Sequence, residues 1–275
     1  MPIGMQQEWK VAALYHFAEV PDPDDFGDRL LEQGKRIGLV GTFIVAGEGI
    51  NGTVAGTPDA IDEIINTIRN EPGFVDTVAK FSSSDLQPFS RFKIKRKPEI
   101  VTFRQDGLDP TVDVGTYVEP KDWNALINDP EVILIDTRND YEYEVGKFKG
   151  AIDPNTKNFV EFTEYVQEHL DPKQHKKVAM YCTGGIRCEK ATALLKREGF
   201  ENVYHLHGGI LKYLEEVPQE ETTWEGACFV FDDRVALDHD LKPADGYFIC
   251  DSCYKPYKDI CPRCNKTSEN RVKKV

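Results

Sequence analysis

One segment constrains the fold of this 275-residue chain more than any other: residues 178–189, Val-Ala-Met-Tyr-Cys-Thr-Gly-Gly-Ile-Arg-Cys-Glu. Its apolar start predicts a buried strand that ends at Cys182, and its last residues predict the beginning of a helix. Between the two, Gly184 and Gly185 permit backbone angles that turn several N–H groups toward one point. A strand, a short glycine turn and a helix in this order are typical of a parallel α/β sheet.

The same segment predicts a reactive thiol. The inward N–H groups, the positive end of the helix and the charge of Arg187 each favour a thiolate at Cys182. We expect Cys182 to be a nucleophile with a lowered pKa, in a cradle that would also hold a persulfide. The competing interpretation, a merely buried cysteine at a strand end, is disfavoured by two glycines and an arginine at this spacing. Cys188 either resolves an oxidised Cys182 as a disulfide or packs as a small helix residue beside the loop.

Apolar periodicity divides the chain into two α/β regions and a tail. The N-terminal region alternates in the order β-α-β-β-α-β, which predicts a ferredoxin-like domain, with a last strand near residues 74–81 and a helix capped by Thr57. The central region alternates strands and helices, which predicts a doubly wound parallel sheet covered on both faces. The predicted boundaries are 8–90 for the ferredoxin-like domain, 91–113 for a basic connector, 114–220 for the parallel-sheet domain and 221–275 for a cysteine-bearing C-terminal segment.

Charge is distributed unevenly. The net charge is -13, so the surface as a whole would repel a phosphate backbone. One run is the exception, because five of its seven residues are basic: Arg91, Lys93, Lys95, Arg96 and Lys97. This run is either a solvated strand face or linker, or a patch that contacts the phosphates of a nucleic acid.

The seven cysteines indicate catalysis and metal binding rather than a disulfide framework, because their number is odd and no secretory signal precedes them. Four of them form two Cys-x2-Cys pairs in the tail: Cys250, Cys253, Cys261 and Cys264. Four thiolates within reach of one ion predict a structural zinc site. The alternative is a set of redox-active dithiols or a reducible disulfide.

Two patterns that would place the chain in or across a membrane are missing from the sequence. The first eight residues have neither the basic start nor the apolar core of a signal peptide. No stretch approaches the roughly 18 consecutive apolar residues of a membrane span. We therefore expect a cytoplasmic protein that does not contact the membrane.

The central region resembles the rhodanese family. The run Leu134-Ile135-Asp136-Thr137-Arg138-Asn139-Asp140-Tyr141-Glu142 is similar to the rhodanese strand that ends in Asp-x-Arg, and Gly146, Gly150-Ala151-Ile152 and Leu206-His207-Gly208-Gly209-Ile210 match further rhodanese positions. The Cys-x4-Arg loop is one residue shorter than the Cys-x5-Arg loop of the related phosphatases, which disfavours a phosphatase. We expect Asp136 and Arg138 to form an ion pair that braces the loop.

Nearly the whole chain resembles the bacterial tRNA uridine hydroxylase family. The likeness lies in residues 41–56, Gly-Thr-Phe-Ile-Val-Ala-Gly-Glu-Gly-Ile-Asn-Gly-Thr-Val-Ala-Gly, in the basic connector and in residues 182–190. It implies dioxygen-dependent conversion of the wobble uridine of tRNA to 5-hydroxyuridine, with Cys182 as the essential cysteine, acting as a thiol or a persulfide. The sequence has no Rossmann glycine fingerprint, so no nucleotide cofactor is evident.

The residues alone leave other functions open. The rhodanese loop by itself predicts a sulfurtransferase that carries a persulfide on Cys182. A non-enzymatic binding module is the third alternative, and the intact Cys182 argues against it. For the hydroxylase we offer one hypothesis of mechanism, in which Cys182 or its persulfide adds to C6 of uracil and makes C5 electron-rich.

Overall fold

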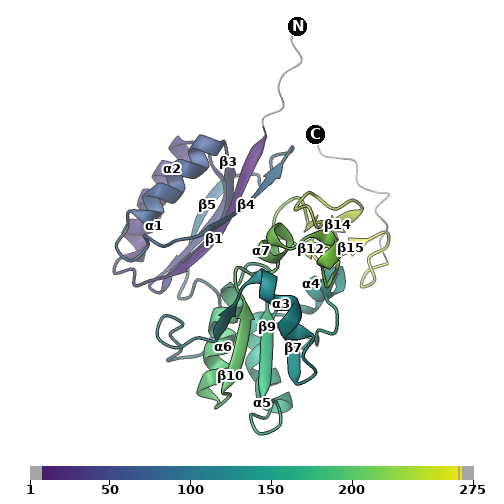
Figure 1. Ribbon diagram of the computed structural model, residues 1–275. Helices are drawn as coiled ribbons and strands as arrows, with labels where there is room; N and C mark the ends of the chain where they lie inside the picture. The colour runs from purple at the N-terminus through teal and green to yellow at the C-terminus, as the bar shows by residue number, and fades with distance from the viewer. Residues whose placement is uncertain (1–7, 266, 268–275) are drawn as a thin grey trace.

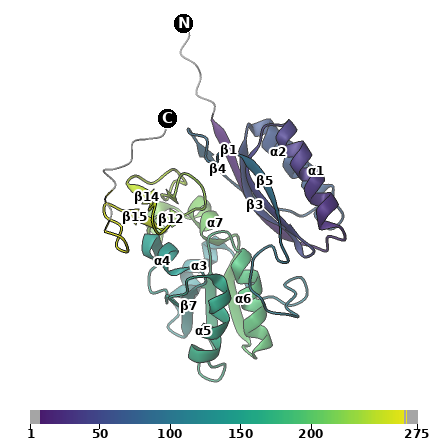
Figure 2. The same ribbon diagram turned by 180° about the vertical axis from the view of Figure 1, so that it is seen from behind.

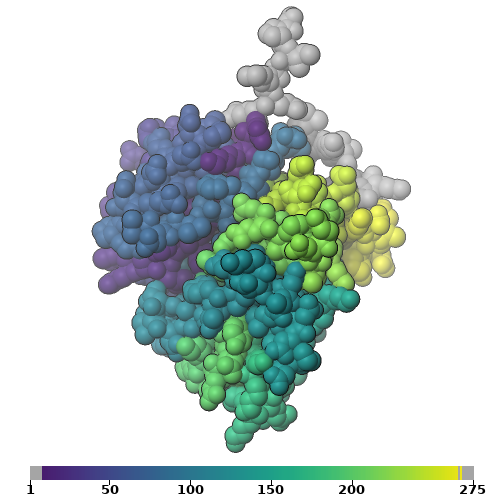
Figure 3. Space-filling view, viewed as in Figure 1, coloured from purple at the N-terminus to yellow at the C-terminus, as the bar shows by residue number. Residues whose placement is uncertain are grey.

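Three parts of the chain lie side by side in the computed structural model, which describes residues 8–265 and 267 (Figure 1). They are the purple and blue first domain, the teal and green second domain, and the yellow-green C-terminal segment. The view from behind shows the two helices of the first domain on the side of its sheet that faces away from the second domain (Figure 2). In the space-filling view the C-terminal segment fills the angle between the two domains (Figure 3).

The first domain is a five-stranded sheet with two helices on one face. The strand order β4-β1-β3-β2-β5 contains the interleaved arrangement of a ferredoxin-like fold, which confirms that prediction. Its elements are β1 Trp9–Phe17, α1 Pro23–Arg36, β2 Val40–Ala46, β3 Gly49–Gly56, α2 Pro58–Arg69, β4 Ala79–Ser84 and β5 Phe92–Arg96.

Both helices of the first domain begin at a side-chain cap followed by proline. The side chain of Asp22 accepts hydrogen bonds from the N–H groups of Asp24 and Asp25, and that of Thr57 accepts one from Ala60. The apolar stripe of α2 is buried against the sheet: Ile61, Ile64, Ile65 and Ile68. The helices therefore cover one face of the sheet, and the other face is left to meet the rest of the molecule.

Two boundaries predicted from the sequence are wrong. The segment expected to open a connector at Arg91 forms β5, which pairs in parallel with β2, because Phe92 and Ile94 pack into the core of the first domain. The strand expected near residues 74–81 begins only at Ala79, because Phe74 is buried within a turn and fills the core there. The first domain therefore extends at least to Arg96.

The second domain is a parallel sheet of order β6-β10-β9-β7. Helices α5 and α6 pack on one face and α3 and α7 on the other, which confirms the predicted doubly wound architecture. The elements are β6 Thr116–Val118, α3 Pro120–Ile127, β7 Val132–Asp136, α4 Asp140–Val145, β8 Gly146–Phe148, α5 Phe162–His169, β9 Lys177–Tyr181, α6 Ile186–Arg197, β10 Asn202–Leu206 and α7 Gly209–Glu216.

The C-terminal segment contacts both domains. Its first strand, β11 (Trp224–Gly226), pairs with β8 of the second domain. Two short hairpins follow: β12 Cys228–Phe229 with β13 Ala236–Leu237, and β14 Tyr247–Ile249 with β15 Pro256–Lys258. Between β12 and β13, the guanidinium of Arg234 donates to Ser82 Oγ of β4 at 2.7 Å. The segment thus fixes the two domains relative to one another.

A buried lysine makes a second connection between the domains. Lys190 of α6 is 3% exposed, and its Nζ lies 2.8 Å from a carboxylate oxygen of Glu48 and 3.0 Å from one of Glu99. Among the described helices none is both long and apolar enough to cross a bilayer. Residues 1–7, which carry most of the segment tested for a signal peptide, lie outside the described residues.

Candidate active site at the Cys182 loop

Cys182 directly follows β9, and its loop is held by the start of α7. The N–H groups of Ile210 and Leu211 donate to the carbonyls of Cys182 and Thr183 at 3.0 and 3.1 Å. Gly209 has a φ of 69°, and a Cβ at this position would lie 2.5 Å from the Cys182 carbonyl oxygen. Only glycine permits so close an approach. The loop is therefore fixed by backbone contacts on its inner side.

The surroundings of the Cys182 sulfur favour the thiolate. Burial opposes ionisation, but the Cys188 thiol, the Arg187 charge and the N–H groups of the α6 N-terminus outweigh it and lower the pKa of Cys182 to about 6. The N–H of Gly185 also donates to Cys182 Sγ at 3.1 Å. Burial raises the pKa of Cys188 well above its ordinary value, and the neighbouring Cys182 thiolate adds to this. The pair therefore holds one thiolate and one thiol.

Arg187 is anchored by a carboxylate that lies beneath the loop. Its two terminal nitrogens donate to the two oxygens of Glu142 at 2.7 and 2.8 Å, and the Glu142 side chain is fully buried. Burial works against ionisation of Glu142, but the charge and hydrogen bonds of Arg187 hold the pKa of this carboxyl below its ordinary value. Glu142 lies on α4, so the ion pair links that helix to the N-terminus of α6.

Asp136 and Arg138 form the expected ion pair. The guanidinium of Arg138 donates to Asp136 at 2.7 to 3.2 Å and to the Gly146 carbonyl at 2.6 Å, and both side chains are buried. The pair lies at the end of β7, where Thr137 donates to the carbonyl of Tyr181, the residue before Cys182. This geometry places the pair beside the loop, and its bracing role stays a prediction.

The loop faces a pocket of about 620 Å³ that all three parts of the chain line; we call it the Cys182 pocket. Tyr15 and Lys80 line it from the first domain, Cys182 and Arg187 from the second, and Phe231 from the C-terminal segment. Cys182 itself is 1% exposed, and the pocket that it lines gives a reactant access to this otherwise buried thiol.

Lys80 brings a positive charge into the Cys182 pocket. Its Nζ lies 5.0 Å from the centroid of the Tyr15 ring. Burial lowers the pKa of this lysine to about 8, although the negative charges of Cys182 and Glu189 partly oppose the shift. Lys80 is thus poised between its charged and neutral forms close to neutral pH.

A tyrosine from each domain binds the same buried carboxylate. Glu189, in the first turn of α6, accepts hydrogen bonds of 2.7 Å from the hydroxyls of Tyr15 and Tyr117. Burial raises the pKa of Glu189, and the two hydroxyls limit the rise. A Cβ on Gly185 would lie 2.8 Å from the Tyr15 oxygen, so the first domain touches the Cys182 loop itself.

Sequence reasoning assigned no role to several residues at this site: Tyr15, Lys80, Tyr117, Asn139, Glu142, Glu189 and Phe231. The side-chain oxygen of Asn139, which lines the Cys182 pocket, is buried without a hydrogen-bond partner among the described residues. Glu142 carried a partial signal, because it follows the Asp-x-Arg run in the sequence. Tyr15 and Lys80 carried none, since their position depends on how the two domains pack.

The five basic residues predicted to bind tRNA divide between two faces of β5. Arg96 points to the helix side, where its guanidinium pairs with Asp24 and Asp28 of α1. Strand alternation directs Lys93, Lys95 and Lys97 to the opposite face, and Lys97 lines the Cys182 pocket. Arg91 precedes the strand and is exposed. The structure thus brings the three lysines to the side of the loop and does not bring Arg96 there.

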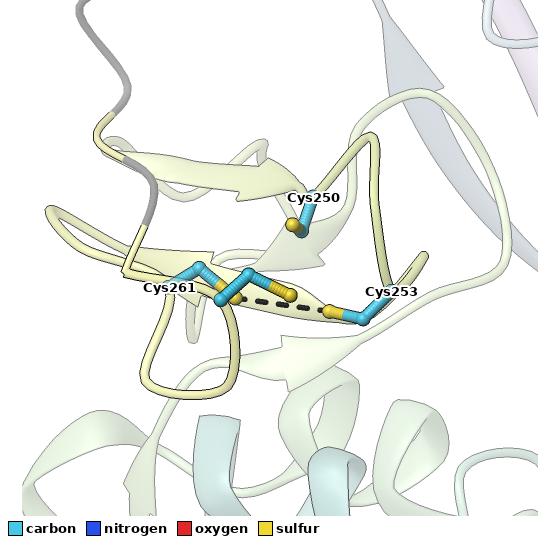
Figure 4. A group of neighbouring side chains, drawn as sticks. Cys250, Cys253 and Cys261 are labelled. Atoms are coloured by element: carbon cyan, nitrogen blue, oxygen red, sulfur yellow. Dashed lines mark hydrogen bonds between the residues drawn. The ribbon is translucent and has the colours of Figure 1, made fainter.

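The four C-terminal cysteines converge. Their sulfur atoms all lie within 4.8 Å of one another, and those of Cys253 and Cys261 are 3.7 Å apart (Figure 4). Tetrahedral zinc with Zn–S bonds of about 2.3 Å requires sulfur atoms about 3.8 Å apart. The donor set therefore fits one zinc ion. The cluster is tied to α4 by Arg263, which donates to both carboxylate oxygens of Glu144 at 2.9 Å.

Comparisons with known proteins cover almost the whole chain. Residues 9–100 match the UPF0176 acylphosphatase like domain, and residues 119–216 match the rhodanese-like domain. A protein of Teredinibacter turnerae named tRNA uridine(34) hydroxylase is 51% identical over an alignment 278 residues long, which covers 96% of this chain and 86% of that protein.

Solved structures match smaller parts of the chain. The rhodanese-like domain of an Anabaena protein is 19% identical and covers 41% of this chain and 80% of its own, with a TM-score of 0.34. A Bacillus halodurans protein is 25% identical and covers 41% of this chain and 77% of its own, with a TM-score of 0.30. These structures match parts of the chain, whereas the Teredinibacter protein matches nearly all of it.

Proposed function

The chain belongs to the tRNA uridine(34) hydroxylase family, and on this premise we propose that it hydroxylates uridine 34 of tRNA with Cys182 as the reacting thiol. One observation carries the proposal: a thiol with a pKa lowered to about 6 lines a pocket that both domains and the C-terminal segment build. An enzyme that acts on a base must take it out of its stack into such a pocket.

The polar groups of the Cys182 pocket suit a uracil ring. Uracil has two carbonyl oxygens that accept hydrogen bonds and one N–H that donates. Protonated Lys80 can only donate, and Asn139, which also lines the pocket, has a side-chain amide oxygen that can accept. We propose that Lys80 donates to the O4 oxygen and that Asn139 accepts from the adjacent N3–H, and that the two side chains thereby select uracil.

For the first chemical step we propose addition of the Cys182 thiolate to C6 of the uracil. A C–S bond forms, the C5–C6 double bond opens, and its electron pair moves to C5 and the O4 oxygen, where the charge of Lys80 stabilises it. One atom of dioxygen is then added to C5 and the other leaves as water, with two electrons and two protons supplied by an external dithiol reductant. Loss of the C5 proton and of the thiolate restores the ring and frees Cys182.

We propose that the four C-terminal cysteines bind a structural zinc ion. The ion would be held by Cys250, Cys253, Cys261 and Cys264, and would order a segment that has only a small apolar core of its own. This segment also forms one wall of the Cys182 pocket. The proposed zinc would therefore maintain the shape of the active site without contacting the substrate.

Nucleoside mass spectrometry of tRNA tests the proposal. Cells that lack this protein should lack 5-hydroxyuridine at position 34, and wild type should restore it, with oxygen-18 incorporated from labelled dioxygen. Cys182→Ala should not restore it, whereas Cys228→Ala, at a buried cysteine outside the pocket, should. Restoration by Cys182→Ala would overturn the role of the thiol, and a label from water alone would overturn dioxygen as the oxygen source.

A sulfurtransferase is the second candidate, and the cradle around the sulfur favours it. The Gly185 N–H that points at Cys182 Sγ would also stabilise a persulfide anion. In that case Cys182→Ala would abolish transfer of sulfane sulfur from thiosulfate to a thiol acceptor and leave the tRNA nucleosides unchanged. Wild-type rescue of 5-hydroxyuridine without measurable sulfane transfer would exclude this candidate.

A further inference from the structure

Phe231 lies on the border of two pockets. It is 66% exposed and lines the Cys182 pocket. It also lines a smaller pocket of about 320 Å³ beside β5, which we call the Phe231 pocket. The edge of its ring meets the buried Phe229 ring at a centroid distance of 4.9 Å and an angle of 83°. A large aromatic side chain is thus held in place at the point where the two pockets meet.

The turn that carries Phe231, residues 230–235, is fixed on several sides. Asp232 and Arg234 form a nearly buried ion pair at 2.6 Å, and Arg234 also donates to Ser82 Oγ. The N–H of Asp233 donates to the Pro88 carbonyl at 3.0 Å. These contacts hold the backbone of the turn so that the Phe231 ring stays exposed, as in a preformed binding surface.

The Phe231 pocket combines aromatic rings with unpaired positive charge. Phe89 and Tyr254 line it together with Phe231, and Tyr254 is 77% exposed. Arg91 and Lys93 line the same pocket, and neither forms an ion pair with any residue in the described range 8–265. Two carboxylates, Asp232 and Asp233, also line it; Arg234 neutralises the charge of Asp232, so the two cations Arg91 and Lys93 exceed the one further carboxylate. Aromatic faces beside cations are the features that bind single-stranded nucleic acid.

A row of lysines connects the two pockets. Lys93 lines the Phe231 pocket and Lys97 lines the Cys182 pocket. Lys95 lies between them, and strand geometry places alternate residues about 6.6 Å apart on the same face. A chain of phosphates could therefore follow β5 from one pocket to the other.

We propose that the Phe231 pocket binds a nucleotide adjacent to uridine 34: its base stacks on Phe231 and its phosphate lies by Lys93 and Arg91. This inference rests on the proposed function and adds a second subsite to it. The subsite would hold the RNA strand in place while the neighbouring uracil enters the Cys182 pocket. Because stacking accepts any base, the subsite would fix the position of the strand and not its sequence.

Binding of an anticodon stem-loop RNA to the full-length protein, measured over a series of salt concentrations, tests the subsite. Phe231→Leu keeps an apolar side chain but removes the ring, and should weaken binding roughly 5- to 100-fold without changing the salt dependence. Phe231→Tyr should bind as wild type does. Lys93→Gln should flatten the plot of log affinity against log salt by about 0.7. Arg96→Gln, whose guanidinium is ion-paired on the helix side, should leave that slope unchanged.

A fluorescent base locates the contact. With 2-aminopurine at each nucleotide that flanks uridine 34, one position should be quenched on binding to wild type and to Phe231→Tyr, but not to Phe231→Leu. Val75→Ala alters a side chain of similar exposure that lines neither pocket, and should behave as wild type.

The outcomes separate the subsite from the function. If wild type neither binds the RNA nor restores 5-hydroxyuridine, the proposed function fails. If wild type does both, and Phe231→Leu binds with equal affinity and quenching, the subsite is overturned. The subsite would also be overturned if the wild-type protein is active but its Phe231 pocket binds an acidic peptide and does not bind RNA.

Discussion

Glu142 and Arg187 form a two-point ion pair beneath the Cys182 loop, with both hydrogen bonds between 2.7 and 2.8 Å. Helix α4, which provides Glu142, also contacts the cysteine cluster through Glu144 and Arg263. The pair therefore connects the position of the catalytic loop to the C-terminal segment. Its contribution can be measured separately from that of the thiol.

Replacing Glu142 by Gln should destabilise the protein strongly. The substitution leaves the buried Arg187 charge without its counterion, which costs about 3 to 5 kcal/mol of unfolding free energy. Urea denaturation measures this loss. Glu131→Gln is the matched control, because its partner Lys177 lies at the surface and the variant should unfold at nearly the same urea concentration as wild type. Equal losses in the two variants would contradict the role of the buried pair.

The thiol of Cys182 should react as a thiolate at mildly acidic pH. Its folded-state pKa lies near 6, so the thiolate predominates above that value and disappears as the pH falls through it. We expect the alkylation rate, followed by peptide mass spectrometry between about pH 4 and 9, to have its midpoint near 6. Cys228 serves as an internal control, because burial raises its pKa to about 12 and it should stay unmodified. A midpoint between about 8 and 9 for Cys182 would refute this prediction.

Hydroxylation should depend on the charge of Lys80 as well. The reaction needs Cys182 deprotonated and Lys80 protonated, so its rate should rise through about pH 6 and fall through about pH 8. Lys80→Met should slow the reaction at least roughly 10-fold, and the alkaline fall should vanish with the lysine. Lys80→Arg should recover part of the rate and shift the alkaline fall upward. The surface variant Lys177→Met should show the wild-type dependence of rate on pH. If Lys80→Met shows that same dependence, the proposed role of the Lys80 charge is excluded.

Removal of metal should loosen the C-terminal segment. We expect one zinc ion per chain by elemental mass spectrometry, and its loss in Cys250→Ser and Cys264→Ser. Trypsin should then cleave faster after Lys258, because the bound ion no longer orders the hairpin that contains it. Cys228→Ala lies outside the cluster and should keep its zinc. A metal-free wild-type chain with a disulfide among the four cysteines would contradict zinc binding.

Much of the architecture could be predicted from local patterns. The Thr57 cap and the isoleucine stripe of α2 follow from helical periodicity, and the Cys182 loop follows from a strand, two glycines and a helix start. These features depend on neighbours within a few residues. The buried Glu142 and Arg187 pair could not be predicted, because the two residues are 45 positions apart in sequence and lie on different helices.

The strand that follows Arg91 shows a different reason for failure. Its basic residues indicated a solvated connector. However, Phe92 and Ile94 alternate with lysines, and their packing against the core beside α1 stabilises a strand. Lys80 and Tyr15 were missed for a similar reason. Both residues lie on the face of the first domain's sheet that the helices leave uncovered. The local sequence does not indicate that the second domain packs there.

Tyr15 of the first domain lines the Cys182 pocket and donates a hydrogen bond to Glu189 of the second, so neither domain forms the complete pocket on its own. The rhodanese-like domain expressed alone would retain Cys182 but lose the side of the pocket that the first domain forms, and the thiol would be more exposed to water and to small electrophiles. Because the two units belong to one polypeptide, the reactive thiol always lies in the Cys182 pocket, which limits the molecules that reach it to those that fit the pocket.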